Sequence, residues 1–246
     1  MAWLFLRCAV GGSLQTPIKT FFNWSTGKDS ALALYRLKQD TRYSVGHLLT
    51  SVNAAHDRVS MHGLRRSLLE RQIAALGLPA STIELPEEPG MPVYEEKMRH
   101  ALADLHRAGF TTAAFGDIFL EDLRRYREDK LSAAGFAAVF PLWKQDTAAL
   151  MCDFIALGFK AVAVCVDLSV LDASFVGREL DASFVADLPA RVDPCGENGE
   201  FHTFCYAGPV FKEEIPFVRG EKVTRHYKSP DGQGDRAFCF ADLLPL

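Results

Sequence analysis

The segment from Ser25 to Ser30, read as Ser-Thr-Gly-Lys-Asp-Ser, carries the residue types that hold a phosphate group. It follows an apolar run and opens a run with helical spacing, and backbone N–H groups at a helix N-terminus attract anions. Lys28 adds a positive charge, and three hydroxyl side chains add hydrogen-bond donors. The Asp29 carboxylate would repel a phosphate unless a cation lay between them. The segment therefore predicts a nucleotide site with Mg²⁺.

A second polar segment, from Gly196 to Thr203, places two glutamates, an asparagine and a histidine close together. Glu197 or Glu200 suits the role of a base or a metal ligand. His202 can move a proton near neutral pH. Asn198 can orient a substrate through hydrogen bonds. The segment predicts chemistry at a carboxylate or an amine.

Each segment also has a simpler interpretation. The first fits a strand, a turn and a helix capped by Ser25 or Thr26. It is not a Walker A loop, because Phe22 stands where glycine is required and Asp29 where serine or threonine is required. The second fits a surface hairpin, since Asn-Gly is a strong signal for a type I′ turn. A zinc site is disfavoured by the unusual ligand spacing along Cys195, His202 and Cys205.

Apolar strand patterns and helical patterns alternate along most of the chain. We predict strands over 18–24, 43–51, 81–85, 111–115, 137–141 and 161–166, and helices over 30–39, 63–76, 93–108, 120–134 and 147–157. This alternation favours an α/β fold with an open, mostly parallel sheet and helices on both faces. Ligands of such sheets bind beyond the carboxyl ends of the strands. We therefore expect the Ser25–Ser30 loop and the Gly116-Asp117 turn to face one pocket, where Asp117 either helps hold the metal or caps a helix.

From about Leu168 the alternation stops, and Asp-Ala-Ser-Phe-Val occurs at 172–176 and again at 181–185. We predict two short turns or helices there, each with an aspartate near its start. The expected organisation is a flexible tail over 1–16, a nucleotide-binding domain over 17–155, and a smaller α+β substrate-binding subdomain over 156–246.

Composition fits an ordinary globular chain of 246 residues, with 48% hydrophobic and 24% charged residues. The formal net charge of −4 gives no general attraction to nucleic acid or to a membrane surface. The six cysteines form no C-x-x-C pair, which favours reduced thiols. No stretch is long and apolar enough to span a membrane. We expect a cytoplasmic protein.

The Ser25–Ser30 loop resembles the S-G-G-x-D-S loop of the ATP pyrophosphatases, the PP-loop, with Thr26 where that family usually has glycine. From about Ile18 to Phe211 the chain resembles the ATP-binding family that includes diphthine–ammonia ligase. The motifs that carry this resemblance are the loop itself, Ser60-Met61-His62-Gly63, Gly116-Asp117-Ile118, Pro141-Leu142-Trp143 and Gly196-Glu197-Asn198-Gly199-Glu200-Phe201-His202-Thr203. The form of the last motif resembles the bacterial branch.

The resemblance implies the PP-loop fold and an ATP-dependent amide-forming ligase. Such an enzyme adenylates a carboxylate, releases pyrophosphate and lets ammonia displace AMP. The implied ATP- and Mg²⁺-binding residues are Ser25, Thr26, Gly27, Lys28, Asp29, Ser30, Met61, His62, Gly116 and Asp117, with Asp29 and Asp117 on the metal. The implied catalytic residues are Lys28, Asp29, Glu197, Glu200 and His202, and the implied substrate-binding residues are Asn198, Thr203, Arg124 and Glu128.

Alternatives remain at several of these positions. Arg124 and Glu128 fit a surface ion pair at helical spacing. Met61 fits core packing, and His62 fits a helix start. For the whole chain, the alternatives are a tRNA-modifying PP-loop enzyme and a non-catalytic ATP-binding module. The expected partners are a small-molecule or protein-borne carboxylate and ammonia, with a homodimer as one option. Neither nucleic acid nor a membrane is expected.

Overall fold

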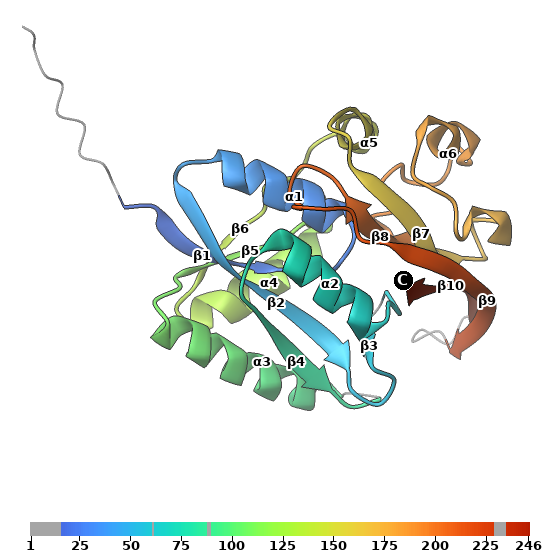
Figure 1. Cartoon of the computed structure of the whole chain (residues 1–246). Helices are drawn as coiled ribbons and strands as arrows, with labels where there is room; N and C mark the ends of the chain where they lie inside the picture. Colours follow the sequence, from blue (N-terminus) through green and yellow to red (C-terminus); the bar gives the residue numbers. More distant parts are fainter. Residues whose placement is uncertain (1–15, 61, 88–89, 229–234) are drawn as a thin grey trace, which may run out of the picture.

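The computed structural model describes residues 16–60, 62–87, 90–228 and 235–246. Two β-sheets, sheet A and sheet B, lie side by side in this part of the chain (Figure 1). Two predictions fall outside the described residues: the nucleotide contact of Met61, and residues 1–15 of the predicted tail.

Sheet A is mostly parallel, as predicted. Its strands are β1 (Ile18–Asn23), β2 (Tyr43–Asn53), β3 (Arg58–Val59), β4 (Ala80–Leu85), β5 (Thr112–Ala114) and β6 (Ala137–Val139). The parallel pairs are β1 with β2, β1 with β5, β2 with β4, and β5 with β6. Only the two residues of β3 pair antiparallel, with the end of β2. The parallel arrangement brings the carboxyl ends of β1 and β5 to the same edge.

Helices cover both faces of sheet A. They are α1 (Lys28–Gln39), α2 (Arg66–Leu76), α3 (Met91–Arg107) and α4 (Glu121–Ala133). A further helix, α5 (Thr147–Ala156), is joined to α1 by the ion pair of Asp153 with Arg36 at 2.7 Å. Successive strand residues point to opposite faces, so Phe21 packs in the core with α3 and α4, and Phe22 packs in the core with α1 and α2. The predicted two-faced α/β layer is confirmed, and these faces place α1 directly after the carboxyl end of β1.

Sheet B is antiparallel and has the strand order β8-β7-β10-β9. Its strands are β7 (Lys160–Asp167), β8 (Phe201–Ala207), β9 (Phe217–Lys228) and β10 (Asp235–Pro245). The apolar run predicted as a buried strand is β7, whose residues 161–167 are all buried. It ends the alternation of strands and helices but lies in sheet B, between β8 and β10. The predicted change to an α+β arrangement in the C-terminal part is confirmed.

The two Asp-Ala-Ser-Phe-Val copies form the two short elements that we predicted. Asp172 caps the 3₁₀ helix η1 (Ala173–Phe175), and Asp181 caps α6 (Ala182–Asp187). Each aspartate accepts a hydrogen bond of 2.8 Å from a backbone N–H in its element. The two phenylalanines of the repeat, Phe175 and Phe184, meet edge to face at 5.4 Å. The repeat therefore builds one packed corner beside sheet B.

Candidate active site

The loop between β1 and α1 is held in a backbone conformation that its sequence resists. Thr26 has a φ angle of +76° and is fully buried. The left-handed region is costly for any residue with a Cβ, and a β-branched residue is rare there. Two donors hold the Thr26 carbonyl oxygen, namely the side-chain amide of Gln72 at 2.9 Å and the Cys205 N–H at 3.0 Å. Contacts from α2 and β8 therefore fix the loop in this shape.

The first turn of α1 is capped from another strand, not by Ser25 or Thr26. The N-cap residue is Gly27, which makes no side-chain cap. The Lys28 N–H instead donates to the Thr203 hydroxyl of β8 at 3.0 Å. A Cβ at Gly27 would lie 3.1 Å from the His62 ring and 3.2 Å from the same hydroxyl. Glycine fits here because three segments meet at this point.

Ser25 and Ser30, at the two ends of the loop, are hydrogen-bonded to each other. Their hydroxyl oxygens lie 2.7 Å apart, and the Ser25 N–H donates to the Ser30 hydroxyl at 3.2 Å. Both side chains sit at the carboxyl end of β1, where we expected the loop to bind phosphate. The hydrogen bond orients the two hydroxyls toward each other.

Lys28 and Asp29 form a close ion pair inside the site. The Lys28 ammonium lies 2.8 and 2.7 Å from the two carboxylate oxygens of Asp29, and it also donates to the Cys195 carbonyl oxygen. The Lys28 side chain is only 3% exposed. Burial lowers its pKa, but the neighbouring negative charge, chiefly that of Asp29, outweighs burial and leaves the pKa raised. Lys28 therefore carries a fixed positive charge between the loop and the second motif.

The Gly116-Asp117 turn after β5 packs against the start of α1, as predicted. A Cβ at Gly116 would lie 2.9 Å from the Ser30 nitrogen and 3.0 Å from the Asp29 carbonyl carbon, so only glycine allows this approach. Asp117 pairs with Arg127 of α4 at 3.1 Å, yet its buried Oδ2 lacks an aligned hydrogen bond. Burial raises the pKa of Asp117, and Asp29 raises it further. The two carboxylates are therefore close enough to repel each other.

Glu197 joins the second motif to this turn. Its Oε1 accepts hydrogen bonds from the Ile118 N–H at 2.7 Å and the Phe119 N–H at 3.4 Å. Burial is the main cause that raises its pKa to about 7, and the charges of Asp29 and Asp117 add to it. A carboxyl group with this pKa can accept and release a proton near neutral pH.

Glu200 has a different position from Glu197. It is buried, and its two carboxylate oxygens accept hydrogen bonds of 3.0 Å from the backbone N–H groups of Asp193 and Asn198 and from the Asn198 side chain. The residues from 188 to 200, all described, form turns and contain no strand, so the hairpin alternative is wrong. Glu200 organises the loop that carries Glu197.

His62 and His202 stack on each other beside the Ser25–Ser30 loop. Their ring centroids lie 4.8 Å apart with an interplanar angle of 25°. His62 Nδ1 lies 3.3 Å from the Thr26 hydroxyl. Burial lowers the pKa of both rings, and for His202 the value falls to about 4. The Ser60-Met61-His62-Gly63 motif and the Gly196–Thr203 motif therefore each contribute one imidazole beside the Ser25–Ser30 loop.

Two models of one protein family match the chain. The N-terminal domain of diphthamide synthase matches residues 18–135, and its C-terminal domain matches residues 146–229. The chain belongs to the diphthamide synthase family. The contacts that assemble the site join the two matched regions, since Lys28 meets Thr203 and Ile118 meets Glu197.

Two relatives of this diphthamide synthase family member carry the same printed name. A diphthine–ammonia ligase of Danio rerio is 28% identical over 132 residues, which are 51% of this chain and 50% of that protein. A diphthine–ammonia ligase of Schizosaccharomyces pombe is 27% identical over 100 residues, which are 39% of this chain and 16% of that protein. The matched segments span half or less of each relative.

Sequence reasoning missed two residues that support the site of this diphthamide synthase family member. Gln72 is fully buried, accepts from the Trp24 indole at 2.9 Å and donates to the Thr26 and Cys205 carbonyl oxygens. Its signal was a polar residue on the apolar face of α2. Asp242 of β10 pairs with Arg58 at 3.0 Å and with Arg65 at 2.6 Å, so it fixes the turn that carries His62. Asp242 lies outside both matched regions, and no local pattern indicated its role.

The predicted substrate contacts Arg124 and Glu128 pair with each other at 2.7 Å on α4. The Arg124 guanidinium also lies 4.5 Å from the ring centroid of Trp143. These residues help line a hollow of about 260 Å³ near the carboxyl ends of β5 and β6. The ion pair that we weighed as an alternative is therefore present, beside a hollow that faces solvent.

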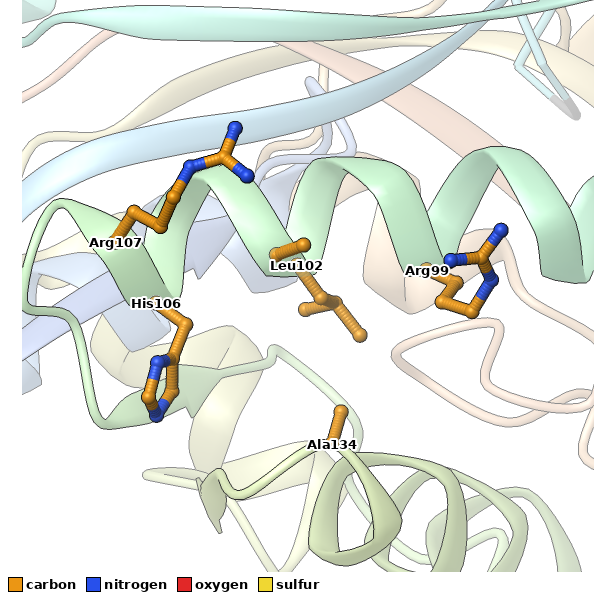
Figure 2. Close-up of a pocket in the computed structure, with 6 residues that line it drawn as sticks. Arg99, Leu102, His106, Arg107 and Ala134 are labelled. Atoms are coloured by element: carbon orange, nitrogen blue, oxygen red, sulfur yellow. The ribbon is translucent and has the colours of Figure 1, made fainter.

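A larger hollow of about 370 Å³ lies away from this site. Figure 2 shows Arg99, Leu102, His106 and Arg107 on α3, with Ala134 across from them. After these residues the chain enters β5 and β6, so the hollow lies at the amino ends of those strands. It is at the opposite edge of sheet A from the Ser25–Ser30 loop, and we assign it no part in the site.

Two further observations bear on metal and membrane. In the described ranges, no three His, Cys, Asp or Glu side chains are grouped so as to hold a metal ion. Mg²⁺ at nucleotide sites uses one or two carboxylates together with substrate phosphates, and Asp117 has a buried oxygen without an aligned hydrogen bond. Asp117 therefore offers an oxygen that fits such an ion, and Asp29 lies close by with both carboxylate oxygens against the Lys28 ammonium. Separately, none of the described helices combines the length and the apolar character needed to cross a membrane.

Proposed function

We propose that this chain is an ATP-dependent amide-forming ligase of the ATP pyrophosphatase type. The observation that carries the proposal is the convergence of the two motifs at Lys28. Its N–H donates to Thr203, and its ammonium bridges Asp29 and the Cys195 carbonyl. A phosphate-binding helix N-terminus and a buried proton-accepting carboxyl group thus share one site. The names of the relatives, diphthine–ammonia ligase, agree with this assignment.

The reaction has two steps. A substrate carboxylate oxygen attacks the α-phosphorus of ATP, the α–β bridging P–O bond breaks, and pyrophosphate leaves with both bonding electrons. Ammonia then attacks the acyl carbon, and AMP leaves as the amide forms and one proton is released. Negative charge builds on the departing pyrophosphate and on the α-phosphate, so fixed donors aimed at these oxygens lower both barriers.

The Ser25–Ser30 loop and α1 supply the positive potential for the first step. The N-terminus of α1 attracts the phosphates, and the Lys28 charge is held by Asp29 where water has little access. When bound, Mg²⁺ would neutralise phosphate charge, and Asp29 and Asp117 would hold it. Gly116 keeps the Asp117 turn against the loop, which brings these groups to one edge of sheet A.

Glu197 is the proposed base for the second step. Its pKa of about 7 lets it take a proton from ammonium or from the attacking amine at neutral pH. The Ile118 N–H fixes one carboxylate oxygen, which leaves the other for the amine. We assign Glu200 and Asn198 to holding the loop, and Arg124 and Glu128 to the rim of the acceptor site. The acceptor is a carboxylate, free or borne on a protein, and residues 156–246 supply most of its pocket.

Release of pyrophosphate tests the proposal. Purified protein is mixed with ATP, MgCl₂, ammonium chloride and a panel of carboxylates, and pyrophosphate and AMP are measured. We expect equal amounts of both, dependent on one acceptor class. Asp29→Asn should abolish release while the circular dichroism spectrum stays unchanged, and Asp153→Asn on the exposed face of α5 should leave it unchanged. ATP binding without pyrophosphate for any acceptor would favour a binding module instead.

A further inference from the structure

The stacked pair of His62 and His202 has an asymmetry that points to a ligand. His62 is engaged by protein, since Nδ1 lies 3.3 Å from the Thr26 hydroxyl and the Thr203 carbonyl also acts on its ring. In the described part of the chain His202 stacks on His62 but has no hydrogen-bond partner. The His202 nitrogens are therefore available to a bound molecule.

The position of the pair identifies what that molecule carries. A Cβ at Gly27 would lie 3.1 Å from the His62 ring, so the pair adjoins the N-cap of α1. His202 precedes Thr203, whose hydroxyl receives the first N–H of that helix. An imidazole at this point faces the end of a helix that attracts anions. A phosphate oxygen is the ligand that both features suit.

The charged groups around His202 are few. Lys28 of α1 is the charged group that acts on the pKa of His202, and its ammonium pairs with Asp29. Cys165 of β7 lies opposite His202 in the strand register and is a thiol. From sheet B the neighbouring side chain Phe201 is apolar and lies under the Lys28 ammonium, 5.5 Å from the ring centroid. Burial first and Lys28 second lower the pKa of His202 to about 4. With no anion bound, the ring is neutral at pH 7.

We propose that His202 is a nucleotide-binding residue that takes up a proton from solvent when the triphosphate of ATP binds, and then donates a hydrogen bond to a phosphate oxygen. This inference rests on the proposed function, because it requires ATP at the loop. A phosphate charge about 4 Å away raises an imidazole pKa by about 3 at an effective dielectric constant of about 20. That brings His202 from about 4 to near 7. The proton returns to solvent when pyrophosphate leaves.

Calorimetry can count this proton. The full chain is titrated with α,β-methylene-ATP, which cannot be cleaved between the α- and β-phosphates, in MgCl₂ at pH 7.0. Two buffers of different ionisation enthalpy give the number of protons bound per nucleotide. His202→Gln keeps a hydrogen-bond donor but cannot titrate. His106→Gln, at the distant hollow in Figure 2, is the matched control.

We expect the wild type and His106→Gln to take up about 0.5 proton more per site at pH 7.0 than His202→Gln. We also expect affinity for the analogue to fall as pH rises in the wild type, approaching tenfold per pH unit between about pH 5 and 6 and levelling off above about pH 7, and to change less in His202→Gln. Equal proton uptake in the wild type and His202→Gln would overturn the inference and leave the proposed function intact. No binding of the analogue to the wild type would overturn both.

Discussion

The side-chain amide of Gln72 donates to the carbonyl oxygen of Thr26 at 2.9 Å, and so a helix on one face of sheet A holds the one residue of the Ser25–Ser30 loop with a positive φ. The same amide accepts from the Trp24 indole and donates to the Cys205 carbonyl. Every hydrogen-bonding group of the Gln72 amide is therefore used. The conformation of the loop depends on this contact and on β8.

Replacing Gln72 by leucine should destabilise the fold by about 2–4 kcal/mol, because it leaves a buried indole N–H and two carbonyl oxygens with lost partners. Chemical denaturation measures the loss. Glu70→Leu, on the exposed face of the same helix, should change stability by no more than about 0.5 kcal/mol. A Gln72→Leu variant as stable as the wild type would show that the hydrogen bonds of this amide contribute nothing net.

The strain at Thr26 predicts an order among two variants. Thr26→Gly and Thr26→Ala both lose the hydroxyl contact with His62, but only alanine keeps a Cβ at φ +76°. Thr26→Gly should therefore be more stable than Thr26→Ala by about 1 kcal/mol, as measured by thermal or urea unfolding. The opposite order would mean that the loop relaxes out of the left-handed region when the threonine is removed.

Glu197 should give the activity a pH dependence. Its pKa is about 7 in the folded protein and about 4.5 in the unfolded chain. Amide formation needs the deprotonated base, so kcat should rise as pH increases through about 7, and Glu197→Gln should lose this limb. Rates at saturating ATP and acceptor from pH 5.5 to 8.5 test it. If kcat of Glu197→Gln still rises with pH through about 7, another group is responsible for that rise.

The carboxyl group of Glu197 should also make stability depend on pH, but here the free energy of unfolding falls as pH rises, whereas kcat rises. Between pH 4.5 and 7 the unfolded chain releases the Glu197 proton while the folded protein keeps it, so this group lowers the free energy of unfolding as pH rises. His202, with its lowered pKa, has the reverse effect between about pH 4 and 6.5. The comparison that isolates Glu197 is therefore wild type minus Glu197→Gln, and this difference should fall with pH across the window.

Asp242 should influence nucleotide binding from outside the nucleotide site. It pairs with Arg58 and Arg65, which flank the turn that carries His62. Asp242→Ala should weaken binding of α,β-methylene-ATP several-fold and cost about 1–3 kcal/mol of stability, because two partly buried guanidinium groups lose their partner. Asp122→Ala, a fully exposed carboxylate, is the control. If Asp242→Ala binds the analogue as tightly as the wild type does, then β10 does not influence nucleotide binding.

Much of the fold followed from the periodicity of apolar residues. Except for the two-residue strand β3, which was not predicted, the strand ranges of sheet A and the ranges of its helices were predicted to within a few residues, because buried strands and amphipathic helices leave strong local patterns. The meeting of the Gly116-Asp117 turn with the loop also followed, since carboxyl ends of parallel strands share an edge.

What could not be predicted depends on contacts between distant segments. The sequence showed that Glu197 and Glu200 are close neighbours, but not that Glu200 faces its own loop while Glu197 reaches Ile118. The capping of α1 by Thr203 and the ion pairs of Asp242 with Arg58 and Arg65 are likewise tertiary contacts, and no local sequence pattern indicates them. The positive φ of Thr26 was not predicted, because threonine rarely adopts it, although the glycine usual at this position in the resembling loop adopts it readily.

The cap that Thr203 supplies to Lys28 spans 175 residues of chain. On a ribosome that adds roughly 5–20 residues per second, about 10–35 s separate the synthesis of these two residues. During that interval the first strand and helix exist without the hydroxyl, the β8 amide or the second imidazole that complete their ligand site. A growing chain would therefore lack the complete proposed site until β8 has been made.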